Sequence, residues 1–383
     1  MLSARFCHRS PPRWPWIAVS YRHYRCLHTS LDSARRYRIL FLGRDEFSCE
    51  ILKALHTAQD VWEIISVGTN PDTKHGPSPL RTVAQSFSIP VHFIPPSKPE
   101  FRHWTLPAPF HAEPSLSSSS PPADHVLITA SFGRILTAAQ LDCFAPDHRL
   151  NVHGSVLPSL RGPAPIQHAI LSGAPTTGVS IARMLKKGID KGPVWATSQV
   201  PVREDATFTS LRDELADHGG KLLVQVLRNM LAGTAAATPQ PPISPTQHAR
   251  AITTADSILD FSTMTADDIV ILHRAIGHQR ALTTWLPLGT RLQLHDPTAL
   301  SSLHPQLSSE LILSDKPGAL VYCKPARSLF IRCARDTVLA VPRVKKERRS
   351  MLEAREFWNG VIQNPRIFVD GEVRLVRMGE EMW

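Results

Sequence analysis

From residue 37 onward, short apolar runs alternate with stretches in which apolar residues recur at helical spacing. The first run, 38–43, predicts a buried strand, and the apolar spacing over 46–58 predicts the helix that follows it. Further strands are expected at 64–67, 90–94, 124–130 and 179–184, and further helices at 80–88, 166–171 and 207–232. Strands that alternate with helices predict a parallel sheet covered by helices, so this part of the chain is expected to be an α/β domain.

Two Pro-rich stretches interrupt this pattern. Residues 95–123 are rich in Pro and Ser and predict a solvated insertion more than a functional lid. Residues 238–245 (TPQPPISP) separate the α/β part from a region of different character. Downstream, a predicted helix at 266–276 precedes short strand-like runs at 291–294, 311–313, 320–323, 329–333 and 338–342, which suggest a small barrel or sandwich. A length of 383 residues agrees with two domains, and we place the boundary near 240–250.

Composition excludes several classes of protein. The chain has no run of 18 uncharged apolar residues, which argues against a membrane-spanning helix. Its 6 Cys residues are too few for a disulfide scaffold of this length, and no CxxC pair suggests a zinc site. We therefore expect a soluble protein of a reducing compartment.

The N-terminal segment, residues 1–36, differs in charge from the rest of the chain. It has seven Arg, no Lys and one acid, Asp32, and it is rich in hydroxylated and aromatic residues. An Arg- and Ser-rich, acid-poor N-terminus is typical of an organellar transit peptide. The alternative is a basic arm that binds nucleic acid. We favour a transit peptide and import into the mitochondrion.

The clearest candidates for catalytic or binding residues lie between 149 and 192. Asn151 and His153 are one residue apart, so on a strand their side chains project to the same face. The Pro- and Gly-rich loop that follows is rigid, and polar groups at this edge of an open α/β sheet occupy the usual binding crevice. Asp190 is an isolated acid in the loop 186–192. Taken singly, the His is more typical of a structural residue, and an Asp between glycines is typical of a turn.

The joint pattern resembles the folate-dependent formyltransferases. Their signature runs Asn-x-His-x-Ser-x-Leu-Pro, then Arg-Gly-x-x-Pro, then Gly-x-Asp-x-Gly, and this chain matches it at 151–158, 161–165 and 188–192. Similar segments also occur at 41–47, 130–136, 256–262 and 345–360. The form of 161–167 and the presence of a second domain resemble methionyl-tRNA formyltransferases more than glycinamide ribonucleotide enzymes. Departures occur at Arg44-Asp45, Phe132, Thr137 and 276–280, outside the Asn/His/Asp set.

This resemblance implies a fold class and a domain organisation. The expected class is α/β: a Rossmann-like formyltransferase domain with a parallel sheet over 37–238, a linker at 239–250, and a small OB-like β-barrel domain that binds tRNA at 251–383. It further implies transfer of the formyl group of 10-formyltetrahydrofolate, a co-substrate, to the α-amine of methionyl initiator tRNA, without a metal. The oligomeric state is open, with a monomer favoured, and no membrane partner is expected.

The resemblance also implies roles for individual residues. Asn151 and His153 would donate to the oxyanion that forms at the formyl carbon, and Asp190 would stabilise the charged imidazole and accept the proton of the amine through water. The folate site would be walled by Ser155, Val156, Leu157, Pro158, Arg161 and Gly162. Contacts to tRNA would come from Lys74 and His75 in the loop 69–80 and from the basic run Arg343, Lys345, Lys346, Arg348 and Arg349, both of which could otherwise be ordinary solvated surface.

Two other functions compete with this one. The first is a formyltransferase or hydrolase that acts on another amine or on formyl-folate, which the basic C-terminal domain argues against. The second is a non-catalytic RNA-binding relative, which the intact Asn151/His153/Asp190 set argues against. A metal hydrolase is disfavoured, since the loop region has no His-x-x-x-His or similarly spaced ligand group.

Overall fold

The computed structural model describes residues 36–74, 76–111, 120–242, 248–300, 313–369 and 371–377. The predictions for the transit peptide, for His75 and for most of the strand at 311–313 therefore lie outside the described residues. Within the described ranges, no helix is both long enough and apolar enough to cross a bilayer.

In the described part of the chain, the N-terminal sheet has seven strands in the order β3-β2-β1-β4-β5-β6-β7. These are β1 Tyr37–Leu42, β2 Trp62–Thr69, β3 Val91–Phe93, β4 His125–Ala130, β5 Arg149–His153, β6 Thr176–Arg183 and β7 Val194–Pro201. The first five strands pair in parallel, which confirms the predicted parallel sheet, whereas β6 and β7 are antiparallel. The sequence did not predict β7, because only Val200 of its residues is fully buried and it lacks an apolar run.

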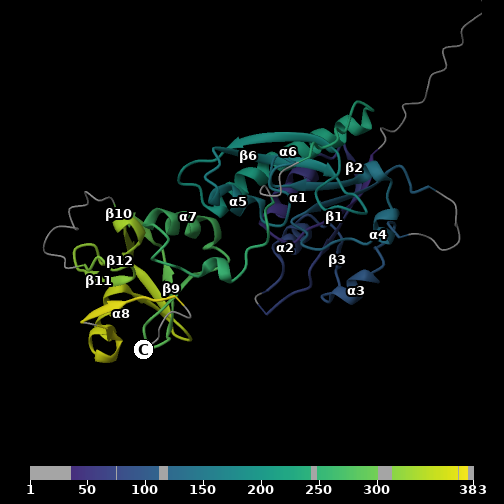
Figure 1. The fold of residues 1–383 in the computed structure, drawn as a ribbon. Coiled ribbons are helices and arrows are strands. Elements are labelled where there is room, and N and C mark those ends of the chain that lie inside the picture. The colour runs from purple at the N-terminus through teal and green to yellow at the C-terminus, as the bar shows by residue number, and fades with distance from the viewer. Residues whose placement is uncertain are drawn as a thin grey trace, which may run out of the picture. The chain divides into compact units, whose positions relative to one another are not determined.

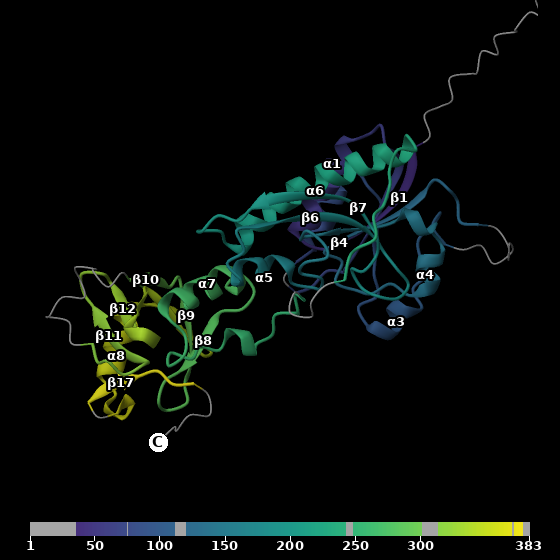
Figure 2. The same ribbon diagram turned by 45° about the horizontal axis from the view of Figure 1, so that its top comes forward.

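Helices cover both faces of this sheet (Figures 1 and 2). They are α1 Glu46–Thr57, α2 Pro79–Ser86, α3 Lys98–Arg102, α4 Ala138–Asp142, α5 Pro165–Leu171 and α6 Phe208–Leu231, with a 3₁₀ turn at Pro146–His148. Helices α1 and α6 pack against each other on one face, and α3 and α4 lie on the opposite side. The start of α1 is fixed by the Asp45 side chain, which accepts a hydrogen bond from the Ser48 amide at 3.3 Å.

One face of strand β5 is part of the hydrophobic core, and the other face has the candidate catalytic residues. Leu150 and Val152 are buried in the cluster that contains the apolar faces of α1 and α6. Because side chains alternate along a strand, Asn151 and His153 project to the other face of the sheet. A second apolar cluster, which includes Leu127, lies on that face. The predicted common face of Asn151 and His153 thus follows directly from the pleat.

Residues 95–111 differ from the solvated insertion expected there. Helix α3 lies in this stretch, and Phe101, Leu106 and Phe110 are 4%, 4% and 1% exposed. Their side chains pack in the second apolar cluster under β1 and β4. The Pro and Ser content suggested a solvated loop. The segment nevertheless has enough large apolar side chains to be buried against the sheet. The adjoining Ser-rich residues 112–119 lie outside the described ranges.

The C-terminal part begins with a 3₁₀ turn, Ala255–Ser257, and helix α7, Ala266–Ile276. In the described residues, one antiparallel sheet has the order β15-β14-β9-β8 and another the order β10-β13-β12-β11-β17-β16. Their strands are β8 Leu282–Trp285, β9 Arg291–His295, β10 Thr298–Leu300, β11 Ala319–Cys323, β12 Ser328–Arg332, β13 Val338–Val341, β14 Arg343–Lys346, β15 Met351–Glu353, β16 Phe368–Val369 and β17 Glu372–Arg374, with helix α8 at Ala354–Ile362 and 3₁₀ turns at Ala334–Asp336 and Pro365–Ile367.

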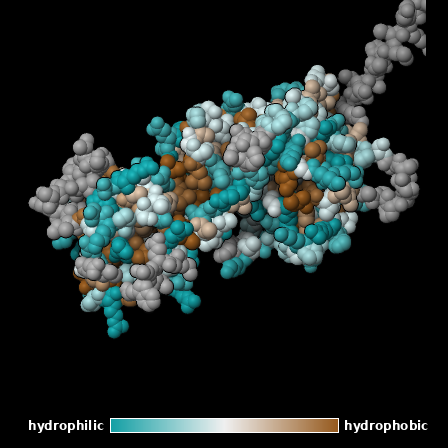
Figure 3. Space-filling model, in the orientation of Figure 1, coloured by the Kyte–Doolittle hydropathy of each residue, from teal (hydrophilic) through white to brown (hydrophobic). Residues whose placement is uncertain are grey.

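The two C-terminal sheets share continuous stretches of chain. Strand β13 passes through Pro342 into β14, and β9 is followed by β10 after two residues. Trp285 of β8 exchanges backbone hydrogen bonds of 3.1 and 2.9 Å with Val376, just after β17. The expected domain of short strands is therefore present, and its strands pair antiparallel. In the described residues it forms two sheets and no single closed one. Hydrophilic side chains cover most of the face in Figure 3, with smaller hydrophobic areas between them.

Candidate active site

The structure brings Asn151, His153 and Asp190 together, although Asp190 lies about forty positions further along the chain. Asn151 Nδ2 donates to Asp190 Oδ1 at 3.3 Å, and His153 Nδ1 lies 3.8 Å from Asp190 Oδ2. The side chains of His153 and Asp190 are only 7% and 10% exposed. At this burial, the attraction between a protonated His153 and the carboxylate is screened less than at the surface.

Asp190 reaches this position because the loop between β6 and β7 folds back over the sheet. The loop contains Gly192, where an added Cβ would lie 1.8 Å from the Arg183 carbonyl oxygen, so the close approach requires glycine. The other carboxylate oxygen of Asp190 accepts a hydrogen bond from the Gly162 amide at 3.1 Å. Asp190 therefore joins the end of β5 to the Arg161-Gly162 loop.

The two ring nitrogens of His153 have different partners. Its Nε2 lies 3.0 Å from the Leu160 carbonyl oxygen, which can only accept, so Nε2 carries a hydrogen. This tautomer is assigned from the hydrogen-bond partner. The other nitrogen, Nδ1, faces Asp190.

Thr129 holds the amide of Asn151 in one orientation. Its hydroxyl, on β4, donates to Asn151 Oδ1 at 2.7 Å, so the Nδ2 group turns toward Asp190. Thr129 is 4% exposed. The sequence did not single it out, although a hydroxyl near the end of a buried apolar strand was the available signal.

The expected folate-site residues lie in the loop after β5. Ser155 is 1% exposed, and its hydroxyl donates to the Ser159 carbonyl oxygen at 2.6 Å. Ser180 of β6 accepts from the Leu157 amide at 2.9 Å and donates to the Ser155 carbonyl oxygen at 2.7 Å. Leu157 is buried, and Val156 and Pro158 are half-buried. These contacts hold the loop rigidly beside His153.

The remaining two expected folate-site residues face the linker. The Arg161 guanidinium donates to Gln240 Oε1 at 3.0 and 2.6 Å. Gly162 has a φ of +120°, and a Cβ there would lie 2.5 Å from the Ala249 carbonyl oxygen. Only glycine meets both conditions at this position.

Asp45 adds a carboxyl group at the end of β1, where the sequence departs from the family pattern. Burial raises the pKa of Asp45, and the hydrogen bond from the Ser48 amide opposes this effect.

Across the described ranges, no three or more His, Cys, Asp or Glu side chains come together in a way that could hold a metal ion.

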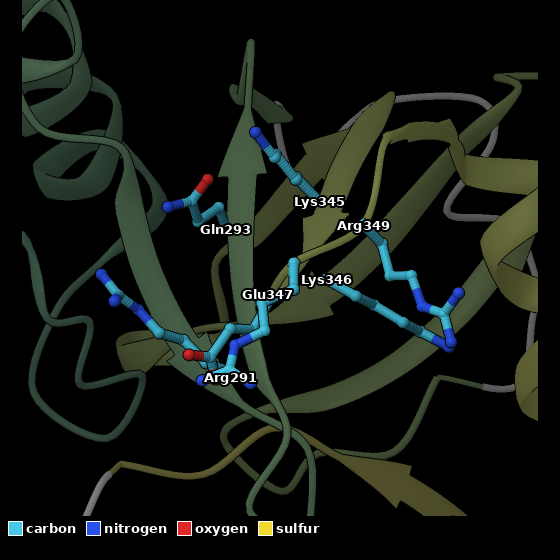
Figure 4. A pocket seen from close by; sticks show the side chains of 7 residues that line it. Arg291, Gln293, Lys345, Lys346, Glu347 and Arg349 are labelled. Atoms are coloured by element: carbon cyan, nitrogen blue, oxygen red, sulfur yellow. The ribbon is translucent and has the colours of Figure 1, made fainter.

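A cavity of about 320 Å³ lies in the C-terminal part and not at Asp190 (Figure 4). It is lined by Arg291, Gln293, Lys345, Lys346, Glu347, Arg348 and Arg349. The structure thus brings four of the expected tRNA-binding cations to one place. Figure 4 shows Arg291 on one side of the cavity and Arg349 on the other. Arg291 and Gln293 were missed, although polar residues at every second position of β9 indicated an exposed strand face.

The surroundings of the expected tRNA-binding cations differ. The Nε of Arg343 donates to Asp296 Oδ2 at 2.8 Å, so its charge is already paired. Lys346 places its Nζ 5.2 Å from the centre of the Phe357 ring, which draws it toward α8. Lys74 is exposed in a turn closed by hydrogen bonds between Thr73 and Gly76.

Two family models match the sequence. The formyl transferase model matches residues 37–227, and the model of the formyl transferase C-terminal domain matches residues 251–361. The chain is 31% identical to the mitochondrial methionyl-tRNA formyltransferase of Mus musculus, across 85% of this chain and 78% of the relative. It is 29% identical to the mitochondrial enzyme of Homo sapiens, with coverage of 92% and 85%. It is 32% identical to the methionyl-tRNA formyltransferase of Janthinobacterium sp. (strain Marseille), with coverage of 84% and 97%.

Solved structures with a similar fold share less sequence. HypX from Aquifex aeolicus, in complex with tetrahydrofolic acid, has a TM-score of 0.55 and 16% identity, across 85% of this chain and 48% of that one. The sugar 3N-formyl transferase WlaRD, determined with dTDP and 5-N-formyl-THF, has a TM-score of 0.53 and 15% identity, across 82% and 99%. At these identities the likeness establishes the fold.

Proposed function

Since this chain belongs to the methionyl-tRNA formyltransferase family, as the sequence resemblance indicated, we propose that it formylates the methionine carried by initiator tRNA. The formyl donor is 10-formyltetrahydrofolate. The observation that carries the proposal is the convergence of Asn151, His153 and Asp190 beside a rigid, buried loop in a chain of this family.

The chemistry of the reaction matches this group of side chains. The α-amine attacks the formyl carbon, a carbon–nitrogen bond forms, and the carbonyl oxygen becomes negatively charged. Asn151 can donate one Nδ2 hydrogen to Asp190 and direct the second to this oxygen. Protonated His153 can donate from Nδ1, because the 3.8 Å separation from Asp190 leaves that hydrogen free for the substrate.

Asp190 has two tasks in this proposal. Its carboxylate holds the Asn151 amide and lies beside His153, and it accepts, through water, the proton that the amine loses. That proton leaves with the folate nitrogen when the bond from this nitrogen to the formyl carbon breaks. The loop from Ser155 to Gly162 would wall the folate site, and the hydrogen bonds of Ser155 and Ser180 support this role by keeping the loop rigid.

The direct test is a formylation assay with three acceptors. The protein is incubated with 10-formyltetrahydrofolate and either methionyl initiator tRNA, free methionine or an aminosugar. We expect N-formylmethionine on the tRNA and little transfer to the two small amines. Transfer to a small amine at an equal or higher rate would favour the competing formyltransferase function.

Thr129→Val tests the orientation of Asn151. The substitution keeps the shape of the side chain but removes the hydroxyl that donates to Asn151 Oδ1. A lost hydrogen bond of about 1.4 kcal/mol corresponds to roughly a tenfold fall in kcat, which steady-state formylation kinetics would measure. Thr177→Val is the matched control, because the buried Thr177 hydroxyl has no hydrogen-bond partner among the described residues. Equal kcat values for the two variants would contradict the role of Thr129.

We also propose that the C-terminal domain is an OB-like barrel that binds the body of the tRNA. The support for a barrel is the continuity of β9 with β10 and of β13 with β14, together with the hydrogen bonds between Trp285 and Val376. The support for tRNA binding is the cavity with five cations and one acid, a charge balance suited to phosphate groups. Lys74 and, outside the described residues, His75 remain proposed contacts of the catalytic domain.

The double substitution Lys345→Ala and Arg349→Ala tests this surface. Each lost phosphate contact reduces the slope of log affinity against log salt by about 0.7–0.9, so the slope should fall by ~1.5 while kcat is retained. Binding of methionyl-tRNA is measured by filter retention at several salt concentrations. Lys324→Ala with Arg327→Ala removes the same charge from the exposed turn between β11 and β12. The surface is wrongly assigned if this control changes the slope as much.

We further propose that the protein acts in the mitochondrial matrix, with residues 1–36 as a transit peptide, 37–238 as the catalytic domain and 251–383 as the tRNA-binding domain. The mitochondrial names of the mouse and human relatives support the location. The seven Arg residues of the segment support its targeting role. A monomer remains the favoured state.

A further inference from the structure

Gln240 lies in the linker and makes four hydrogen bonds with two active-site loops. Its Oε1 accepts from Nε and Nη2 of Arg161, at 3.0 and 2.6 Å. Its Nε2 donates to the carbonyl oxygens of Asp190 and Gly192, at 2.9 and 2.6 Å. Thr238, just before it in the chain, exchanges two backbone hydrogen bonds with Val194 at the start of β7, which fixes where Gln240 enters the site.

These contacts determine the spacing between the two loops. One loop supplies the Asp190 carboxylate, and the other supplies the Gly162 amide that donates to it. Gln240 makes hydrogen bonds to the backbone of Asp190 and to Arg161, the residue before Gly162. We propose that Gln240 is a positioning residue, which holds the Asp190 carboxylate next to His153 and Asn151. This inference rests on the proposed function for its kinetic consequences.

The chemistry of the contacts requires an amide. The side chain must accept from a guanidinium at one atom and donate two hydrogens to carbonyl oxygens at the other, which only Asn and Gln can do in one planar group. A carboxylate would keep the Arg161 contact but would face two carbonyl oxygens without a hydrogen to donate. The segment after the linker reinforces the arrangement, because the Ala249 amide donates to the Arg161 carbonyl oxygen at 2.7 Å.

Gln240→Glu is the decisive variant. It preserves size and the bond with Arg161 but removes both donated hydrogen bonds, so the Asp190 loop should shift. A misplacement of this kind is expected to lower kcat by ~10- to 100-fold, with the KM for methionyl-tRNA changed less than about twofold. Gln85→Glu, on the exposed side of α2, introduces the same charge far from the site and should match the wild type. Wild-type kcat in Gln240→Glu would overturn the inference.

A double-mutant cycle separates positioning from a general loss of stability. If Gln240 acts through Asp190, then Gln240→Glu should change the single-turnover rate less than about twofold in an Asp190→Ala background. An equal loss in both backgrounds would show a role independent of Asp190.

Amide hydrogen exchange tests the same contacts without any substrate. In Gln240→Glu, peptides that cover 159–165 and 185–193 should exchange faster, while a peptide from β1 should not. Unchanged exchange in both peptides would overturn the inference. If the wild type fails to formylate methionyl-tRNA, the proposed function is wrong, and this measurement still decides the role of Gln240.

Discussion

Asp190→Asn is expected to lower kcat by ~10³-fold, because one substitution removes both the charge partner of His153 and the proton acceptor. The amide keeps the shape of the carboxylate but has no negative charge to pair with His153. It also cannot take the proton of the attacking amine. The substituted side chain would also have only one oxygen, instead of two, to accept the hydrogen bonds from Asn151 and Gly162. Single-turnover formylation of methionyl-tRNA measures the effect.

The control for this variant is Asp205→Asn, whose side chain is 82% exposed. It removes the same charge at the surface and should match the wild type. Asp205→Asn should unfold at the denaturant concentration of the wild type, and Asp190→Asn at a lower one, because one buried donor loses its acceptor. Folded Asp190→Asn that retains more than about a tenth of wild-type kcat would show that the carboxylate does not move the proton.

His153→Ala is expected to reduce kcat by ~10²- to 10³-fold, the usual cost of losing one donor to an oxyanion. The ring also holds the Leu160 carbonyl oxygen through Nε2, so part of the loss would come from the loop. His153→Gln separates the two contributions, since glutamine can donate a hydrogen bond to Leu160 but cannot be protonated. We expect its kcat to stay close to that of His153→Ala.

His168→Ala is the matched control for the histidine variants. Its Nε2 also lies 3.0 Å from a backbone carbonyl oxygen, that of Arg250, but His168 lies on α5, outside the proposed catalytic group. We expect less than a threefold fall in kcat. The role of His153 would be refuted by a His153→Ala protein that keeps more than about a tenth of wild-type turnover.

The parallel part of the first domain could be predicted because its signals are local. Apolar runs and helical spacing placed β1, β4 and α1 within a few residues of their observed bounds. Strand β7 lacked such a run, and the Pro content of 95–111 concealed Phe101 and Phe110. Strand β7 forms by pairing with β6, whereas Phe101 and Phe110 are buried against β1, which is distant from them in sequence.

The site was predictable to different degrees. The common face of Asn151 and His153 follows from the two-residue period of a strand. Asp190 was identified through the family resemblance, since an acid between glycines is by itself typical of a turn. Thr129 and Gln240 were missed, because a hydroxyl in a strand and an amide in a Pro-rich linker have many ordinary roles.

The amino-acid order by itself therefore determined the alternating elements, the family and the pair on β5. Only the folded chain decided that the loop after β6 turns back, that Gly162 donates to Asp190, and that β9 and β14 gather their cations around one cavity. The physical reason is the distance along the chain over which each effect acts. Periodicity and propensity act over a few residues, whereas these contacts join segments that loop closure and packing bring together from distant positions.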